Sequence, residues 1–267
     1  MWSGISNIGL KTTMLFNTNK IHEQFQRYCR IVPATTAELK NQAYSIRHQV
    51  YCEELEWLPS HNNFLETDPY DQVSHHCLLQ NVTNNEFIGC IRMVLAIPSE
   101  PQASMPFQLT CKQLKESEPD QEQLMQGLVG EVSRLAVLRQ YRHRPQEQFK
   151  AVSLTDADFG TAKQPRFPYI PIGLYMGVLE MARLHNVKTL YILTDPSLAR
   201  HLCRLGGKLE RIGDPVEHLG TRIPYKMVID EVISQMNPAL HPLFDVICDE
   251  VRQGYQDQFQ PHLTAAE

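Results

Sequence analysis

The 267-residue sequence predicts an α/β protein whose central sheet is of mixed direction, with helices that cross between its strands. Three observations lead to this prediction. A helix with a capped start follows an apolar run near residue 30. Two apolar runs are joined by a four-residue turn. A helix, a strand and a second helix then follow residue 169 in close succession. Nothing in this order of elements requires a second domain.

The first third of the chain predicts a strand, a helix and a hairpin. Residues 28–34 have the composition of a short strand, and Thr35 and Glu38 then have capping-box spacing at a helix start. One face of this helix is apolar, at Leu39, Ala43, Ile46 and Val50. Strands follow at about 73–81 and 87–96, and the sequence Thr-Asn-Asn-Glu between them predicts an antiparallel hairpin.

The rest of the chain predicts the remaining strands and helices around one long loop. Residues 98–127 form a mixed, proline-containing and helical region, and an apolar strand occupies about 131–138. The basic and then polar stretch 139–168 is a long loop, of a kind that is often functional or mobile. The elements after it are a helix after Pro171, strands at 188–194, 208–213 and 223–231, and a helix at 196–207 that glycines end.

These elements predict a peripheral N-terminal extension (1–27), one α/β domain (28–235) and a peripheral helical C-terminal tail (236–267). The first residues lack the basic region, apolar region and cleavage site of a signal peptide, and Met14 offers an alternative start. No run of about 18 apolar residues is present, so we expect no transmembrane helix.

Composition restricts the classes of ligand. The formal net charge is −5, which disfavours non-specific binding of nucleic acid, so a local arginine cluster favours a small anionic ligand over a polymer. An odd number of cysteines without a C-x-x-C pair argues against a disulfide framework or a zinc ribbon and for a reducing compartment. We expect buried or half-buried thiols at all seven: Cys29, Cys52, Cys77, Cys90, Cys111, Cys203 and Cys248.

The strand at 131–138 begins with a carboxylate and an arginine beside an apolar run. In a regular strand Glu131 and Ser133 share one face and Arg134 points to the other. A β-bulge would bring Glu131 and Arg134 to one side and splay the strand from its neighbour. The backbone N–H groups then left free can bind a thioester carbonyl or an amide-rich cofactor arm. A structural Glu–Arg pair at a strand end accounts for the same residues equally well.

Three arginines follow this strand directly in the sequence: Arg139, Arg142 and Arg144. A guanidinium matches the geometry of a phosphate, so these three residues can hold the phosphates of a cofactor. A solvated run of charge is the alternative interpretation. The long loop after them excludes a P-loop.

Further charged residues stand upstream. Asp68 and Asp71 flank Pro69-Tyr70 and can grip an amine, bind a metal or end turns, which is the commonest role of Asp-Pro. Arg92 lies inside an apolar strand and needs a carboxylate partner, which Glu131, Asp68 or Asp71 can supply.

In this order the residues resemble the pattern of the acyl-homoserine-lactone (autoinducer) synthases, which have the GNAT acyltransferase fold. The residues that carry the resemblance are Arg47, Tyr51, Trp57, the E-x-D-x-Y-D stretch from Glu66 to Asp71, Gly89-x-x-Arg92 and Glu131-Val-Ser-Arg134. Residues 170–207 are more similar to another branch, the PEP-CTERM/exosortase system-associated acyltransferases, which are akin to N-acyl amino acid synthases. The resemblance covers roughly residues 30–230, about three quarters of the chain.

The resemblance implies a GNAT-like fold: a mixed central sheet with a splayed strand, flanked by helices. An acyl thioester of coenzyme A or acyl carrier protein would bind where two central strands splay, and an amine would attack it directly. Glu131 would be the catalytic base, while Arg134 and Arg92 would fix its charge and the carboxylate of the acceptor.

The resemblance also implies binding roles, and it implies no metal. The implied substrate-binding residues are Arg47, Tyr51, Trp57, Asp68, Asp71 and Ser133. The implied acyl-donor site comprises backbone groups of Leu135, Ala136 and Val137 and the side chains of Arg139, Arg142 and Arg144. The sequence departs from many GNAT enzymes in two places. Arg-Gln-Tyr-Arg-His-Arg stands where they carry R/Q-x-x-G-x-G/A, and Leu202 stands where they place a tyrosine acid.

We therefore expect an N-acyltransferase that moves a medium or long acyl chain from acyl-CoA or acyl carrier protein to the amine of an amino acid or a similar small acceptor. The alternatives are an acyl-homoserine-lactone synthase that uses S-adenosylmethionine and a non-catalytic module that binds acyl carrier protein. The expected location is the bacterial cytoplasm, with contact at the inner membrane surface, and nucleic acid is not an expected partner.

Overall fold

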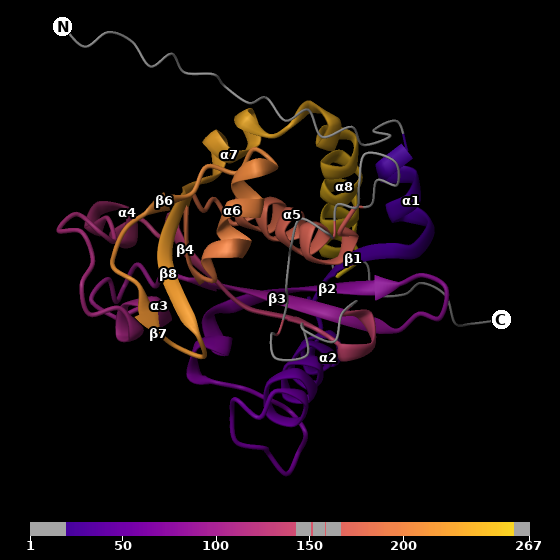
Figure 1. Cartoon of the computed structure of the whole chain (residues 1–267), viewed down its shortest axis with the longest axis horizontal. Coiled ribbons are helices and arrows are strands. Elements are labelled where there is room, and N and C mark those ends of the chain that lie inside the picture. The colour runs from indigo at the N-terminus through magenta and orange to yellow at the C-terminus, as the bar shows by residue number, and fades with distance from the viewer. Residues whose placement is uncertain (1–19, 143–150, 152–157, 159–166, 259–267) are drawn as a thin grey trace, which may run out of the picture.

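A computed structural model describes residues 20–142, 151, 158 and 167–258, and within these ranges eight strands form one mixed sheet. Their order across the sheet is β1-β2-β3-β4-β5-β8-β6, and β7 pairs with β8 off this path (Figure 1). Neighbouring strands are antiparallel except for β4 and β5, which are parallel. The strands are β1 (Cys29–Pro33), β2 (Ser74–Asn81), β3 (Phe87–Leu95), β4 (Val129–Val137), β5 (Thr189–Thr194), β6 (Glu210–Arg211), β7 (Val216–Glu217) and β8 (Thr221–Val228).

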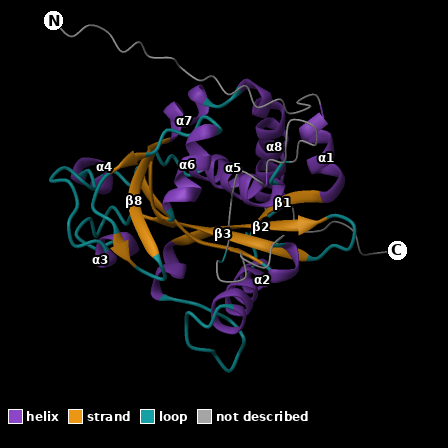
Figure 2. Ribbon diagram, in the orientation of Figure 1, coloured by secondary structure: helices purple, strands orange, loops and turns teal. Residues whose placement is uncertain are grey.

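Helices cover both faces of the sheet (Figure 2). On one face α5 packs across β1 to β4, and α1 and α8 lie beside it. On the other face α2 packs against β2, β3 and β4. The helices are α1 (Ile21–Tyr28), α2 (Ala37–His48), α3 (Pro106–Thr110), α4 (Gln121–Met125), α5 (Tyr169–Leu184), α6 (Pro196–Arg204), α7 (Ile229–Gln235) and α8 (His241–Asp257). None of the helices in the described ranges is both long enough and apolar enough to cross a membrane.

The helix α2 begins and ends differently from the prediction. Its N-cap is Thr36 rather than Thr35, and the Thr36 hydroxyl accepts a hydrogen bond from the Leu39 N–H at 3.3 Å. At its C-terminal end the chain continues as a π-helix, η2 (Gln49–Glu54). Such turns are often found at functional sites. Here the π-helix carries Tyr51, whose hydroxyl donates to the Leu135 carbonyl at 2.9 Å.

The sheet opens between β4 and β5, as the splayed strand of the prediction requires. The two strands pair only from Val129 to Val132. A β-bulge follows at once on β4, because Arg134 and Leu135 together face the single residue Ile91 of β3. Arg134 has a φ of 53°, in the left-handed region that a non-glycine residue seldom adopts.

Several predicted elements need correction. The strand predicted at 223–231 ends at Val228, where α7 begins, and the short strand β7 was not predicted. The C-terminal tail is helical, but it is not peripheral, since α8 buries Leu243 and Val251 in the main core. Residues 21–28 also belong to that core through Phe25. Six cysteines are buried thiols as expected, whereas Cys203 is exposed.

Two glycines let α5 approach the elements beneath it. A Cβ atom on Gly177 would lie 2.9 Å from Ile31 Cγ2, and one on Gly173 would lie 2.8 Å from Phe25 Cε2. Real Cβ atoms essentially never come this close, so a larger residue would push α5 away from β1 and α1.

We therefore expect Gly177→Val to lower the free energy of unfolding by about 1–3 kcal/mol. Leu184→Val on the same helix, where the side chain is exposed, is the control and should change it by less than about 0.5 kcal/mol. Urea denaturation of both variants measures the difference. Equal stabilities would show that the close approach of α5 is not needed.

Candidate active site

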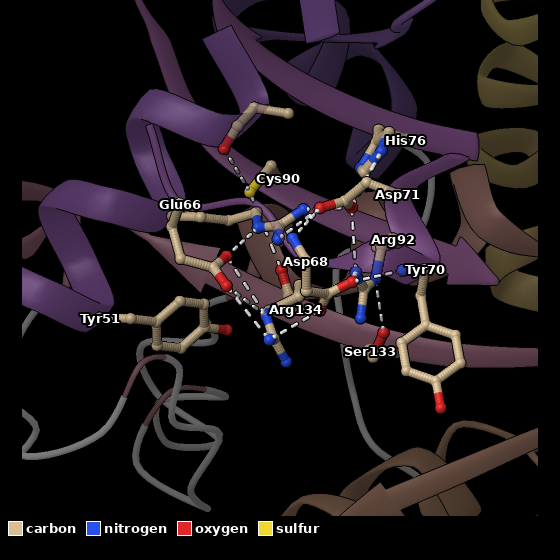
Figure 3. Close-up of polar contacts among 12 residues, drawn as sticks. Tyr51, Glu66, Asp68, Tyr70, Asp71, His76, Cys90, Arg92, Ser133 and Arg134 are labelled. Atoms are coloured by element: carbon tan, nitrogen blue, oxygen red, sulfur yellow. Dashed lines mark hydrogen bonds and ion pairs between the residues drawn. The ribbon is translucent and has the colours of Figure 1, made fainter. Parts of the chain in front are cut away.

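A network of alternating charges connects α2 with strands β3 and β4 (Figure 3). It joins the end of α2, the loop that leads into the 3-10 helix η3 (Pro69–Val73), strand β3 and the bulge of β4. Three guanidinium groups and three carboxylates take part, so the network is neutral overall. Its members are Arg47, Arg92, Arg134, Glu66, Asp68 and Asp71.

Arg47 lies at the buried end of the network. Its side chain is fully buried and binds Glu66 through Nε and Asp71 through both terminal nitrogens, at 2.7 and 3.0 Å. Burial alone would raise the pKa of Asp71. Hydrogen bonds and charge from Arg47, with the charge of Arg92, instead hold that pKa well below its usual range. Asp71 is therefore ionised at neutral pH.

Asp68 connects the two remaining arginines. It accepts hydrogen bonds from Arg92 Nη1 at 2.7 Å and from Arg134 Nη2 at 2.9 Å, and Arg134 also binds Glu66 at 3.1 Å. Asp68 caps η3 as well, through the Tyr70 N–H at 2.9 Å. The turn-forming role and the charge-binding role of this aspartate thus occur together.

Glu131 stands apart from these ion pairs. Its carboxylate accepts a hydrogen bond from the Phe107 N–H at 3.0 Å, and the side chain is buried. Burial raises the pKa of Glu131 to about 8, although this hydrogen bond and the charges of Arg92 and Arg134 oppose the shift. The partners of Arg92 are Asp68 and Asp71, not Glu131. A carboxyl group with this pKa can release or accept a proton near neutral pH.

A cavity of about 260 Å³ occupies the opening between β4 and β5. Glu131, Ser133 and Arg134 line it from β4, and Thr194 and Asp195 face them from the end of β5. Aromatic residues form another wall, where Tyr51 and Trp57 stack with their ring centroids 6.0 Å apart. The turn between β7 and β8 completes the cavity with His218 and Leu219, together with Arg222 near the start of β8.

A second, apolar cavity lies among α5, α6, α7, β5 and β8. It measures about 60 Å³, and Tyr175 lines both cavities. Its other lining residues include Met176, Leu179, Leu202 and Met227. Leu202, the residue at the position of the tyrosine acid of many GNAT enzymes, therefore belongs to an apolar wall.

The predicted catalytic and substrate-binding residues divide into two groups. Glu131, Arg134, Tyr51, Trp57 and Ser133 line the cavity. The others do not line the cavity but form ion pairs within the charge network: Arg47, Arg92, Asp68 and Asp71. Arg92, predicted as a catalytic residue, lies outside the cavity wall: it is fully buried and donates to Asp68, Asp71 and the Ser133 hydroxyl.

The predicted acyl-donor residues are only partly at the cavity. Leu135 lines it, whereas Ala136 and Val137 do not, and the Val137 N–H already donates to the Ala151 carbonyl at 3.1 Å. The side chain of Arg142 is buried and forms an ion pair with Glu54. The backbone N–H of Arg139 donates to Glu54 at 3.2 Å, and Arg144 lies outside the described residues.

Several residues of the site were not predicted from the sequence. Glu66 was recognised as part of a motif but was given no role, although it binds two arginines. Phe107, His218 and Arg222 had no signal in the sequence, because they reach the cavity through tertiary packing from segments without a motif. In the described part of the chain, no group of His, Cys, Asp and Glu is arranged to hold a metal ion.

The sequence profile described as acetyltransferase (GNAT) domain matches residues 46–150. No curated protein matches the sequence. Among solved structures, the chain is similar to TofI in a ternary complex with an inhibitor and MTA, with a TM-score of 0.53, 20% identity, and 80% of this chain and 99% of that chain covered. The AHL synthase LasI gives a TM-score of 0.50 at 16% identity, covering 80% and 93%.

The CoA-dependent acyl-homoserine lactone synthase BjaI, solved with SAM and isopentyl-CoA, gives a TM-score of 0.51 at 16% identity, covering 86% of this chain and 99% of that chain. Together with the splayed strands, these similarities show that the chain has a GNAT-like acyltransferase fold. The predicted fold class is thereby confirmed.

The charge network predicts a large cost for removing one member. We expect Arg47→Met to lower the free energy of unfolding by about 3–5 kcal/mol, because it leaves Glu66 and Asp71 buried without their partner. Lys208→Met removes an exposed ion pair with Glu231 and is the control, with an expected loss of at most about 1 kcal/mol. Chemical denaturation at neutral pH measures both. Similar losses would contradict a structural role for the network.

Proposed function

We propose that this protein is an N-acyltransferase that moves a medium or long acyl chain from an acyl thioester to the amine of an amino acid or a similar small acceptor. One observation carries this function: Glu131, with a pKa near 8, lines the cavity where β4 and β5 separate. A base with this pKa suits an amine that must lose a proton near neutral pH. The family profile and the fold agree with acyl transfer.

The proposed reaction is a direct attack of the amine on the thioester carbon. A C–N bond forms, the C–S bond breaks, and the amine proton moves to the carboxylate of Glu131, directly or through water. The leaving thiolate needs no acid, since thiols have a low pKa, in keeping with Leu202 at the position of the tyrosine acid. A backbone N–H near Leu135 would polarise the thioester carbonyl.

The apolar cavity supports a medium or long acyl chain over an acetyl group. It begins at Tyr175, which also lines the reaction cavity, and its walls are almost wholly aliphatic. Coenzyme A and acyl carrier protein are both proposed as carriers of the chain. The association with PEP-CTERM/exosortase systems rests on the sequence resemblance alone.

Acylation of S-adenosylmethionine with release of a lactone is the second candidate, because BjaI, which has a similar fold, was solved with SAM and isopentyl-CoA. Mass spectrometry of lipid extracts tests both functions. Cells that express the wild-type chain should contain new N-acyl amino acids that are absent with Glu131→Gln. N-acyl-homoserine lactones in their place would favour the second candidate. The absence of any new amide, with purified acceptors and acyl-CoA as well, would favour a binding module.

The pKa of Glu131 predicts the pH profile of the reaction. We expect kcat/KM to rise with pH through about 8, because the base acts only after it has lost its own proton. Glu131→Gln should lower kcat/KM by about 10²–10⁴ and remove this rise. Acceptor amines of different pKa separate the titration of the amine from that of Glu131. A rise that follows only the amine would exclude Glu131 as the base.

The apolar cavity predicts the acyl length. We expect Leu202→Phe, which fills part of this cavity, to shift the products toward shorter acyl chains. Leu243→Phe makes the same change in the same core but outside the cavity, and it should leave the chain lengths unchanged. Product analysis by mass spectrometry compares the two variants. The same distribution in both would show that the acyl chain lies elsewhere.

A further inference from the structure

We infer that Arg222, assisted by His218, binds the carboxylate of the acceptor, so that the acceptor is a free amino acid rather than a simple amine. This assignment rests on the proposed acyl transfer, and it names the class of acceptor. It also moves the recognition of the carboxylate from Arg92 and Arg134, where the sequence predicted it, to the start of β8 and the turn before it.

The two arginines predicted for this role are already engaged. Arg92 is fully buried and binds Asp68 and Asp71. Arg134 does line the cavity, but its guanidinium donates to Glu66 and Asp68. The network has equal numbers of positive and negative groups, so a further carboxylate would find no excess positive charge there. Another cation must therefore balance the carboxylate of an amino acid.

Arg222 is the other arginine of the cavity wall within the described residues. Its side chain is 17% exposed, and its Nη2 donates to the Leu219 carbonyl at 2.9 Å, which fixes the guanidinium against the turn. Its one ion pair in the described part of the chain is with Asp195, at 3.7 Å, longer than a hydrogen bond. Its Nη1 also donates a long hydrogen bond to the Thr221 carbonyl, at 3.4 Å. These contacts use only part of the five N–H groups of a guanidinium, so donors remain that suit a carboxylate.

Asp195 does not occupy the position that a substrate carboxylate would take beside Arg222. It is the N-cap of α6, where Oδ1 accepts hydrogen bonds from the Ser197 N–H at 2.8 Å and from the Leu198 N–H at 3.4 Å. These bonds hold its carboxylate on the helix end. The aspartate thus orients Arg222 from a distance, and a substrate carboxylate can approach the guanidinium more closely.

His218 adds a second polar group at the same wall. It lies on the turn between β7 and β8, where its backbone N–H donates to the Gly220 carbonyl at 3.0 Å. Burial, then the charges of Arg222 and Arg134, lower the pKa of its ring. The imidazole is therefore neutral at pH 7, and it lies near both cations. A neutral ring donates one hydrogen bond to an anion without needing a counter-charge.

The anion at this wall has two chemical sources, the carboxylate of the acceptor and a phosphate of the donor. We assign the carboxylate because Arg222, His218 and Glu131 line the same cavity. In an amino acid the carboxylate lies within a few bonds of the amine, and that amine must come close to the base. The experiment separates the two sources by changing the acceptor and the donor independently.

The test compares wild type with Arg222→Gln and Arg222→Lys. Steady-state kinetics are measured with the proteinogenic amino acids and with their carboxamides, each with acyl-CoA and with the phosphate-free acyl-pantetheine. We expect Arg222→Gln to lower the preference in kcat/KM for the acid over the carboxamide by about 10- to 100-fold, mainly through KM. Arg222→Lys should restore part of it. Arg211→Gln, at an exposed position paired with Asp214, is the control and should change nothing.

Each other outcome is decisive. An unchanged preference in Arg222→Gln overturns the assignment. A raised KM for acyl-CoA but not for acyl-pantetheine shows that the anion is a donor phosphate, and this also overturns it. If the wild type acylates no amine, the proposed function fails by itself. Calorimetric binding of the same amino acids and carboxamides then decides the present inference, which requires binding of the acids that Arg222→Gln loses.

Discussion

The site depends on one buried constraint: guanidinium groups from α2, β3 and β4 share the carboxylates of a single short loop. Asp68 is bound by Arg92 and Arg134, and Asp71 by Arg47 and Arg92, so no arginine can move without affecting another. These contacts hold Arg134 at a φ of 53° within the bulge of β4. The bulge begins where the pairing of β4 with β5 ends, and the reaction cavity lies in that opening.

Such a network is an expensive way to hold a strand, because each charge loses its hydration on burial. Replacement by apolar residues of similar volume is often neutral or stabilising in proteins. What the charges add here is directional geometry, since bidentate and bridging hydrogen bonds fix both distance and angle. Glu131 forms no ion pair with them, and the charges of Arg92 and Arg134 only partly oppose the rise of its pKa. It is excluded from the ion pairs, and burial therefore dominates its pKa.

Local patterns predicted the parts of the fold that depend on neighbours in sequence. The hairpin of β2 and β3 followed from a turn between two apolar runs. The bulge was one of two interpretations of a glutamate and an arginine that a regular strand would have placed on opposite faces, and the structure has it. The partner of Arg92 stayed open among three carboxylates, because only the packing of η3 against β3 decides it. The packing of α8 and the position of Arg222 depend on long-range contacts, which no local pattern records.

The arginines have two different roles, which sequence motifs alone do not distinguish: some hold other charged groups, and Arg222 faces the cavity. A sequence motif can contain residues that touch a substrate as well as residues that only hold the groups that do. Arg92 belongs to the E-x-D-x-Y-D and E-V-S-R constellation but is sealed inside it, whereas Arg222 belongs to no motif and faces the cavity. A residue of the charge network, which must pair with several buried charges at once, can be replaced by few residue types. A wall residue that meets only the acceptor can change with the acceptor. Differences in acceptor specificity among proteins of this fold should therefore lie at the start of β8 and the turn before it rather than in the charge network.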